Sequence, residues 1–194
     1  MIERGFDRVR TTLESALKVP FAAVVSSTLP HDGKTEVAVG TARAFARAGF
    51  RTLIADANPL NPAVGPALGL GELALPARLA LSELAPVPAP SDKGLDAVSI
   101  AGIRLLDEAA PALVRMFVDD VRSAYDVVIF DACEVFFSGF VPVCAAACDG
   151  VVLAVRYARN PDPEDDRVVS TLEQMGARII GSVPTGFPDD PRFG

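Results

Sequence analysis

The residues best suited to chemistry lie in the stretch 27–35, Ser-Thr-Leu-Pro-His-Asp-Gly-Lys-Thr, between a short apolar run and a helical pattern. The N–H groups of such a loop and of the first helical turn form a site for anions. There Lys34 would reach the β- and γ-phosphates of a nucleotide, and the Thr35 hydroxyl would ligate Mg²⁺. The stretch therefore predicts a phosphate-binding loop in which Gly33, Lys34 and Thr35 hold ATP or ADP with magnesium. The alternative is an incidental Gly-Lys-Thr at a helix start.

Two carboxylates at the ends of apolar runs complete the expected site. Asp131 closes Val-Val-Ile-Phe-Asp, and Asp56 closes Thr-Leu-Ile-Ala-Asp. In phosphoryl-transfer sites an aspartate at a strand end holds Mg²⁺. Asp56 and Asp131 are therefore predicted to join Thr35 as metal-binding residues. A solvated aspartate, or one that caps a helix, is the alternative for either position.

Short apolar runs alternate with helical patterns along the chain. Strands are predicted at residues 21–27, 51–56, 125–131, 149–156 and 177–183, with 95–99 as a short extra strand, and helices at 34–48 and 163–175. The proline-rich stretch 84–93 is interpreted as a surface loop rather than a domain boundary, and the residues after 183 as irregular. Continuous Val, Ile and Leu runs are typical of parallel strands buried on both faces. We expect one α/β domain over residues 1–194, a three-layer P-loop NTPase fold with a mostly parallel central sheet covered by helices on both faces.

Composition and charge narrow the class of protein. The chain has 194 residues, of which half are hydrophobic and 22% charged, a profile typical of globular proteins. The net charge of −7 argues against nucleic acid as a partner, because no basic surplus is present to displace counterions. No apolar run is long enough to span a bilayer, and the N-terminal stretch is too polar for a signal peptide. A cytoplasmic location is therefore expected.

The three cysteines, Cys133, Cys144 and Cys148, are expected to be reduced thiols. Cys144 and Cys148 lie four residues apart and would share one face of a helix. A metal site there would need further ligands, and the single histidine, His31, is distant in the sequence. We interpret the cysteines as small, buried apolar residues.

Three segments together resemble the bacterial tyrosine kinases (BY-kinases) of capsule and exopolysaccharide export, within the MinD/ParA-like P-loop ATPases. The family's loop runs Ser-Ser-x-x-Pro-x-x-Gly-Lys-Ser/Thr, and it is matched by Ser26, Ser27, Pro30, Gly33, Lys34 and Thr35. Its second motif is an apolar strand followed by Asp-x-Asp-x-Arg, and its third, Tyr-Asp-x-Val-Ile-Ile-Asp, resembles residues 125–131. Weaker similarity in the N-terminal helix and the closing segments extends the resemblance over about residues 4–183. The resemblance implies that Pro30 also contacts nucleotide and that Lys34, Asp56 and Asp131 act in catalysis.

The second motif departs from the family pattern. Asn58 stands in place of the second aspartate, and Leu60 in place of the arginine. In the family that aspartate lies near Mg²⁺ and the attacking hydroxyl. Asparagine orients a group but cannot accept a proton as a carboxylate does, and loss of a general base costs roughly 10²–10⁴-fold in rate. The departure therefore predicts weak catalytic activity.

Further departures lie downstream. Cys133 and Glu134 follow the third motif where the family has prolines, and Thr185 stands where an asparagine usually contacts adenine. The family's C-terminal tyrosine cluster, its own phosphorylation substrate, is missing, and Tyr125 and Tyr157 are the chain's two tyrosines. These differences indicate a degenerate member.

Two residues of the loop, His31 and Asp32, differ from the family pattern. His31 stands where the family often has glycine, and it either crowds or contacts the phosphates or faces solvent. We prefer the solvent-facing histidine. Asp32 replaces a frequent glutamate and is expected to place a negative charge near the anion site.

The N-terminal helix bears on assembly. In the family, Glu-x-x-Arg-x-x-Arg in this helix builds subunit contacts in a ring, and the corresponding residues here are Arg4, Asp7 and Arg10. The first two charges are exchanged. Such an exchange could still match itself across a symmetric interface, or it could prevent mixing with ordinary members. A solvated helix face is the alternative to the expected homo-oligomer.

The resemblance and the departures together imply a degenerate BY-kinase-like protein of exopolysaccharide or capsule biosynthesis and export, with weak or no tyrosine kinase activity. It would bind the cytoplasmic segment of a membrane polysaccharide co-polymerase or export protein, at the inner face of the membrane. One alternative is a working ATPase or protein-tyrosine kinase in which Asp56 acts as the base. Another is a MinD/ParA-type positioning ATPase, which usually has a lysine at the Leu29 position and a basic or amphipathic surface.

Overall fold

The computed structural model describes residues 2–102, 111–157 and 159–187, with side chains from residue 5 onward. Its strands are β1 (Phe21–Ser27), β2 (Thr52–Ala57), β3 (Val87–Pro88), β4 (Leu95–Ser99), β5 (Val127–Ala132), β6 (Gly150–Arg156) and β7 (Ile179–Thr185). They form one sheet in the order β3-β4-β2-β5-β1-β6-β7. Neighbouring strands run parallel, except that β3 pairs antiparallel with β4.

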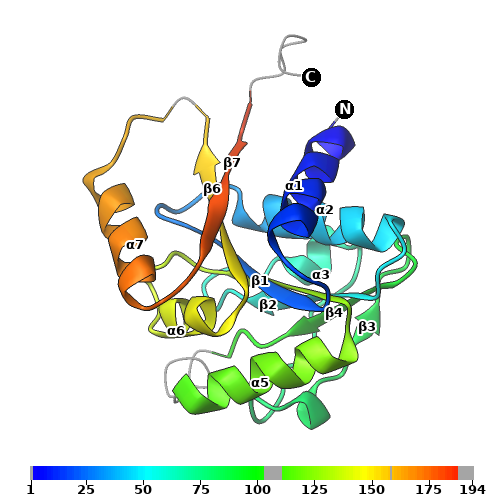
Figure 1. The fold of residues 1–194 in the computed structure, drawn as a ribbon. Helices are drawn as coiled ribbons and strands as arrows, with labels where there is room; N and C mark the ends of the chain where they lie inside the picture. The colour runs from blue at the N-terminus through cyan, green and yellow to red at the C-terminus, as the bar shows by residue number, and fades with distance from the viewer. Residues whose placement is uncertain (1, 103–110, 158, 188–194) are drawn as a thin grey trace.

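Helices cover both faces of this sheet (Figure 1). They are α1 (Ile2–Ala16), α2 (Lys34–Arg47), α3 (Val64–Ala67), α5 (Pro111–Ala124), α6 (Phe140–Ala147) and α7 (Pro163–Gln174), with a short 3₁₀ helix at Leu81–Glu83. The first three pack against one face around Phe21 and Phe45. The last three pack against the other face around Phe117, Phe130 and Phe140. The three-layer α/β fold predicted from the sequence is confirmed.

The sheet explains why the strands read as continuous apolar runs. In β1, β2 and β5 every residue is buried, because these three strands lie in the middle of the sheet with helices on both sides. Alternate residues of each strand enter the two cores: Phe21, Ala23 and Val25 face α1 and α2, whereas Ala22 and Val24 face the other layer. Parallel strands covered on both faces need apolar side chains in both directions.

Some predicted boundaries were wrong. The stretch 84–93, predicted as a loop, contains β3, whose Val87 and Pro88 pair with Ala97 and Asp96. Proline is tolerated there because β3 lies at the sheet edge. β7 also continues past residue 183 to Thr185, paired with Arg156 at the end of β6. The short strand at 95–99 is confirmed as β4.

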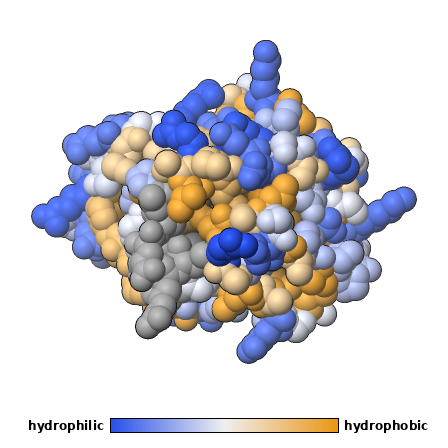
Figure 2. Space-filling model, turned by 90° about the horizontal axis from the view of Figure 1, so that it is seen from below, coloured by the Kyte–Doolittle hydropathy of each residue, from blue (hydrophilic) through white to orange (hydrophobic). Residues whose placement is uncertain are grey.

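The surface carries apolar patches among charged side chains, as Figure 2 shows for the underside of the molecule, where α5 lies. On α5, Leu113 and Met116 are 53% and 62% exposed. Within the described residues, no helix has the length and apolar character needed to cross a membrane.

Candidate nucleotide-binding site

The predicted phosphate-binding loop connects β1 to α2. Two residues in it have left-handed backbone conformations, His31 with φ 63° and Gly33 with φ 82°. Gly33 is also the N-cap of α2, and a Cβ at this position would lie 2.9 Å from Cβ of Thr185. Glycine is therefore required both by the backbone and by the close approach of β7. The turn leaves the first N–H groups of α2 at the loop, where an anion would bind.

The structure brings the predicted metal-binding residues together. Thr35 Oγ1 donates a hydrogen bond of 2.6 Å to Asp131 Oδ2. Asp56 and Asp131 are register neighbours on the parallel strands β2 and β5, one at the end of each apolar run. Both carboxylates are buried. Strand ends at one edge of a parallel sheet thus place two carboxylates and one hydroxyl beside the loop.

Asp131 has an unusual charge state. Burial raises its pKa to about 7, the Thr35 hydrogen bond lowers it in part, and the neighbouring Asp56 charge raises it further. Its Oδ1 is buried and has no hydrogen-bond partner among the described residues. A magnesium-bound water would satisfy this atom, and Mg²⁺ in nucleotide sites needs only one or two carboxylates besides water and phosphates. The residues present therefore fit the metal.

Asp56 and Asn58 are tied to the local backbone. Asp56 Oδ1 accepts from the N–H of Asn58 at 3.1 Å, and its Oδ2 accepts from the N–H of Val64 at 3.0 Å. Burial raises the pKa of Asp56, and these backbone hydrogen bonds lower it in part. Asn58 Oδ1 accepts from the N–H groups of Leu60 and Asn61 at 3.2 and 3.4 Å. Both side chains thus stabilise the turn that leads to α3.

Lys34 contacts a residue that the sequence interpretation had noted only as a departure. Its Nζ forms an ion pair of 2.7 Å with Oε1 of Glu134. The two side chains are 7% and 14% exposed. Glu134 lies two residues beyond the end of β5, so the third predicted motif delivers a further carboxylate to the loop. The signal in the sequence was the replacement of a proline by a charged residue.

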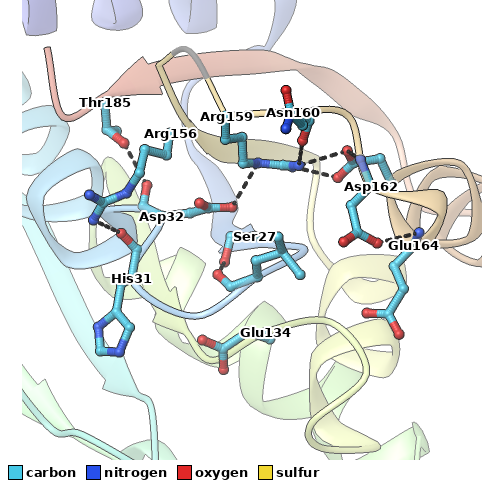
Figure 3. Close-up of polar contacts among 12 residues, drawn as sticks. Ser27, His31, Asp32, Glu134, Arg156, Arg159, Asn160, Asp162, Glu164 and Thr185 are labelled. Atoms are coloured by element: carbon cyan, nitrogen blue, oxygen red, sulfur yellow. Dashed lines mark hydrogen bonds and ion pairs between the residues drawn. The ribbon is translucent and has the colours of Figure 1, made fainter.

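Two arginines brace the loop, Arg156 from the end of β6 and Arg159 from the β6–α7 connection (Figure 3). Arg156 Nη2 donates to the carbonyl oxygen of His31 at 2.6 Å. Arg159 binds both carboxylate oxygens of Asp165, and its Nε lies 3.6 Å from Asp32 Oδ2. The hydrogen bond from Arg159 lowers the pKa of Asp165 to about 2. Sequence reasoning missed both arginines because more than a hundred residues separate them from the loop.

Asp32 corrects one expectation. It was predicted to place a negative charge near the anion site, but its side chain is 2% exposed and faces Arg159. The guanidinium offsets the charge because the two groups are buried together. The backbone oxygen of Asp32 accepts a hydrogen bond of 2.7 Å from Thr185 Oγ1. Thr185, which occupies the family's adenine-contact position, therefore holds the loop itself. His31 is exposed, as preferred from the sequence, and so is Pro30.

The charges of α1 form pairs within the chain. Arg10 Nη1 donates to both oxygens of Glu14 at 2.8 Å. Asp7 lies 3.7 Å from Arg47 of α2. Arg4 lies outside the side chains that the structure describes. Assembly through α1 therefore stays a prediction.

The cysteines are placed as expected. Cys133 and Cys144 are buried, and Cys148 is partly buried. The sulfur atoms of Cys144 and Cys148 lie 4.0 Å apart on α6 and its C-terminal cap. Among the residues that the structure describes, no cluster of three or more His, Cys, Asp or Glu side chains is arranged to hold a metal.

Known proteins resemble the chain in sequence and share its fold. No protein-family model matches the chain. Tyrosine-protein kinase CpsD of Streptococcus agalactiae is 25% identical over 195 residues, spanning 93% of this chain and 82% of the kinase. The kinase domain of VpsO superposes with a TM-score of 0.81 at 20% identity, over 96% of this chain and 95% of that domain. The predicted resemblance to the bacterial tyrosine kinases is confirmed.

A second relative in sequence is a much longer protein. Succinoglycan biosynthesis transport protein ExoP of Rhizobium meliloti is 26% identical over 82% of this chain, and the match spans 21% of ExoP. In fold, the chain is also similar to a protein with a different printed role. Septum site-determining protein MinD of Pyrococcus horikoshii, solved with Mg-ADP, has a TM-score of 0.68 at 15% identity.

Proposed function

We propose that the chain is a degenerate BY-kinase-like protein of exopolysaccharide or capsule biosynthesis and export, which binds nucleotide with weak or no tyrosine kinase activity. The observation that carries the proposal is the second motif. Asn58 has no carboxylate to accept a proton, and its amide oxygen is bonded to two backbone N–H groups. Both oxygens of the neighbouring Asp56 are also bonded to backbone N–H groups. These contacts support the proposal that the chain lacks the base that the second motif supplies in the family.

Nucleotide binding is supported by the loop. The N–H groups at Gly33 and at the start of α2 would hold the phosphates, and Lys34 would contribute a positive charge. Thr35 and Asp131 would hold Mg²⁺, which neutralises phosphate charge when bound. Burial raises the pKa of Asp131 to about 7, so below neutral pH its carboxyl would have to lose a proton before it could face the metal.

We further propose that the partner is the cytoplasmic segment of a membrane polysaccharide co-polymerase or export protein. The relative ExoP, named as a transport protein, has a BY-kinase-like match over only 21% of its length. This chain would supply the corresponding part, at the inner face of the membrane. Its net charge of −7 suits the partner, because cytoplasmic segments beside membrane spans carry a surplus of Lys and Arg. A homo-oligomer through α1 is part of the same proposal.

Calorimetry with Mg-ATP and an assay for phosphotyrosine test the two halves of the proposal separately. We expect micromolar binding that is lost in Lys34→Ala, because the variant lacks the ammonium that would contact the β- and γ-phosphates. We also expect no phosphotyrosine above the level of the Lys34→Ala control. Robust tyrosine autophosphorylation would contradict degeneracy, whereas absence of binding up to millimolar ATP would contradict nucleotide binding.

The second candidate is a working ATPase or kinase. It is favoured by the contact between Thr35 and Asp131, which brings together a hydroxyl and a carboxylate that would hold Mg²⁺. Steady ATP turnover that disappears in Lys34→Met would support this candidate. Lack of turnover in the presence of the membrane partner would count against it.

A further inference from the structure

Glu134 forms an ion pair with Lys34, the residue whose ammonium would bind the phosphates of a nucleotide. Its Oε1 lies 2.7 Å from Lys34 Nζ, and both side chains are largely withdrawn from solvent. A carboxylate at this distance forms a charge-assisted hydrogen bond, the strongest kind between side chains. Phosphate oxygens bind a lysine ammonium by the same interaction. The carboxylate of Glu134 and a nucleotide phosphate therefore have the same binding partner.

The other charges near the loop have partners of their own. Asp32 faces Arg159, and Arg159 also binds Asp165. Asp131 accepts a hydrogen bond from the Thr35 hydroxyl. Lys34 and Glu134 are thus left as a pair. If the two side chains separate and no other group takes their place, each is left as a poorly solvated charge.

The backbone on both sides of Glu134 is fixed. The N–H of Val135 donates to the carbonyl oxygen of Ser27 at 3.1 Å, and the N–H of Phe137 donates to that of Glu134 at 3.0 Å. Val135 itself is buried. A nucleotide phosphate can therefore displace Glu134 only by rotation of its side chain, with the turn held in place.

We propose that Glu134 is a built-in competitor of the nucleotide phosphate at Lys34, so that nucleotide binds only by displacing it. The inference rests on the proposed nucleotide binding and adds its regulation. Glu134 keeps the empty loop ordered, because it neutralises Lys34, and it sets a threshold of nucleotide concentration for occupancy. A phosphate group is the required ligand, since it must replace a carboxylate on the same ammonium.

The test compares Mg-ATP affinity by calorimetry in the unaltered protein, Glu134→Gln and Glu134→Ala. Removing a charge-assisted competitor is expected to tighten binding roughly tenfold or more. Glu36→Gln is the matched control, because Glu36 is an exposed carboxylate in the first turn of α2 and its loss changes the net charge equally. We expect Glu36→Gln to bind as the unaltered protein does. Thermal melting without nucleotide should show lower stability for Glu134→Ala, and Mg-ATP should restore it.

The outcomes separate the two proposals. If the unaltered protein binds Mg-ATP and neither Glu134 variant binds more tightly than Glu36→Gln, competition by Glu134 is wrong and nucleotide binding stands. If the protein and both Glu134 variants show no binding at millimolar Mg-ATP, both proposals are wrong. Tighter binding in Glu134→Gln, which preserves the length of the side chain, would show that the charge of Glu134 is the competing feature.

Discussion

Asp131 is a buried carboxylate that would favour a bound cation and that is destabilising when it is charged without one. Its carboxylate lies between the sheet and the loop, fully buried, with one oxygen bonded to Thr35 and the other without a partner among the described residues. A buried carboxylate without a cation is destabilising when charged. The same position becomes favourable once a cation is present. A bound cation would therefore offset the cost of burying this carboxylate in its charged form.

We predict that Asp131→Asn stabilises the empty protein in a pH-dependent way. The folded-state pKa of Asp131 is raised to about 7 from 3.8, so the native state binds the proton more tightly than the unfolded chain. The free energy of unfolding should fall as the pH rises from about 4 to about 7. Asparagine does not ionise, so the variant avoids this fall. Its free energy of unfolding should exceed that of the unaltered protein by roughly 2–4 kcal/mol at pH 8, and the difference should shrink towards pH 4. Urea unfolding at several pH values measures it.

Asp120→Asn serves as the control for that experiment. Asp120 is an exposed residue of α5, and its substitution makes the same change in net charge. Its effect on the free energy of unfolding should be small at every pH. If Asp131→Asn raises the free energy of unfolding equally at pH 4 and pH 8, the pKa of Asp131 is not raised in the folded protein.

At the scale of elements, α1 is joined to the rest of the fold through α2. Leu13 and Leu17 are buried in the core that α2 shares. One turn of α2 is shaped to receive a ring from α1, because a Cβ built at Gly40 would overlap the ring of Phe6. Such close approach needs a residue without a side chain. The packing of α1 therefore depends on a position in the middle of α2.

We predict that Gly40→Val loosens α1. The added side chain displaces Phe6, at a cost of roughly 1–3 kcal/mol, and amide hydrogen exchange in α1 should become faster. Gly5→Ala in α1 is the control, because a Cβ there meets nothing within 4 Å. Combining Gly40→Val with Phe6→Ala should recover part of the loss, since the overlap is removed. Unchanged exchange in Gly40→Val would mean that the ring is not needed to hold α1.

The elements were largely predictable and their contacts were not. β1, β2 and β5 could be found from the sequence because burial on both faces demands unbroken apolar runs. The two-residue β3 could not, since Val87 and Pro88 are exposed and carry no period. The pairing of Lys34 with Glu134 and of Asp32 with Arg159 depends on strand order, which no local pattern encodes. Site residues within motifs were found, and those delivered by topology were missed.

At the scale of the whole molecule, the loop is a meeting point of distant segments. Lys34 and Thr35 come from α2, Glu134 from the end of β5, Arg159 from the β6–α7 connection and Thr185 from β7. These contacts link the layer that contains α1 and α2 to the layer that contains α6 and α7. A ligand bound at the loop should therefore stabilise the whole domain. Its binding should be measurable as a change in global unfolding.

We predict that Mg-ATP raises the melting temperature of the protein. A ligand that binds only the folded state adds about 2.7 kcal/mol at a hundred times its Kd. In a chain of this size each 1 kcal/mol raises the melting temperature by about 2–4 °C, so a shift of roughly 5–10 °C is expected by scanning calorimetry. AMP should give a much smaller shift because it lacks the phosphates that Lys34 would bind, and Lys34→Ala should abolish the shift with Mg-ATP. An equal shift in Lys34→Ala would place the nucleotide elsewhere, because at this loop the Lys34 ammonium would contact the β- and γ-phosphates.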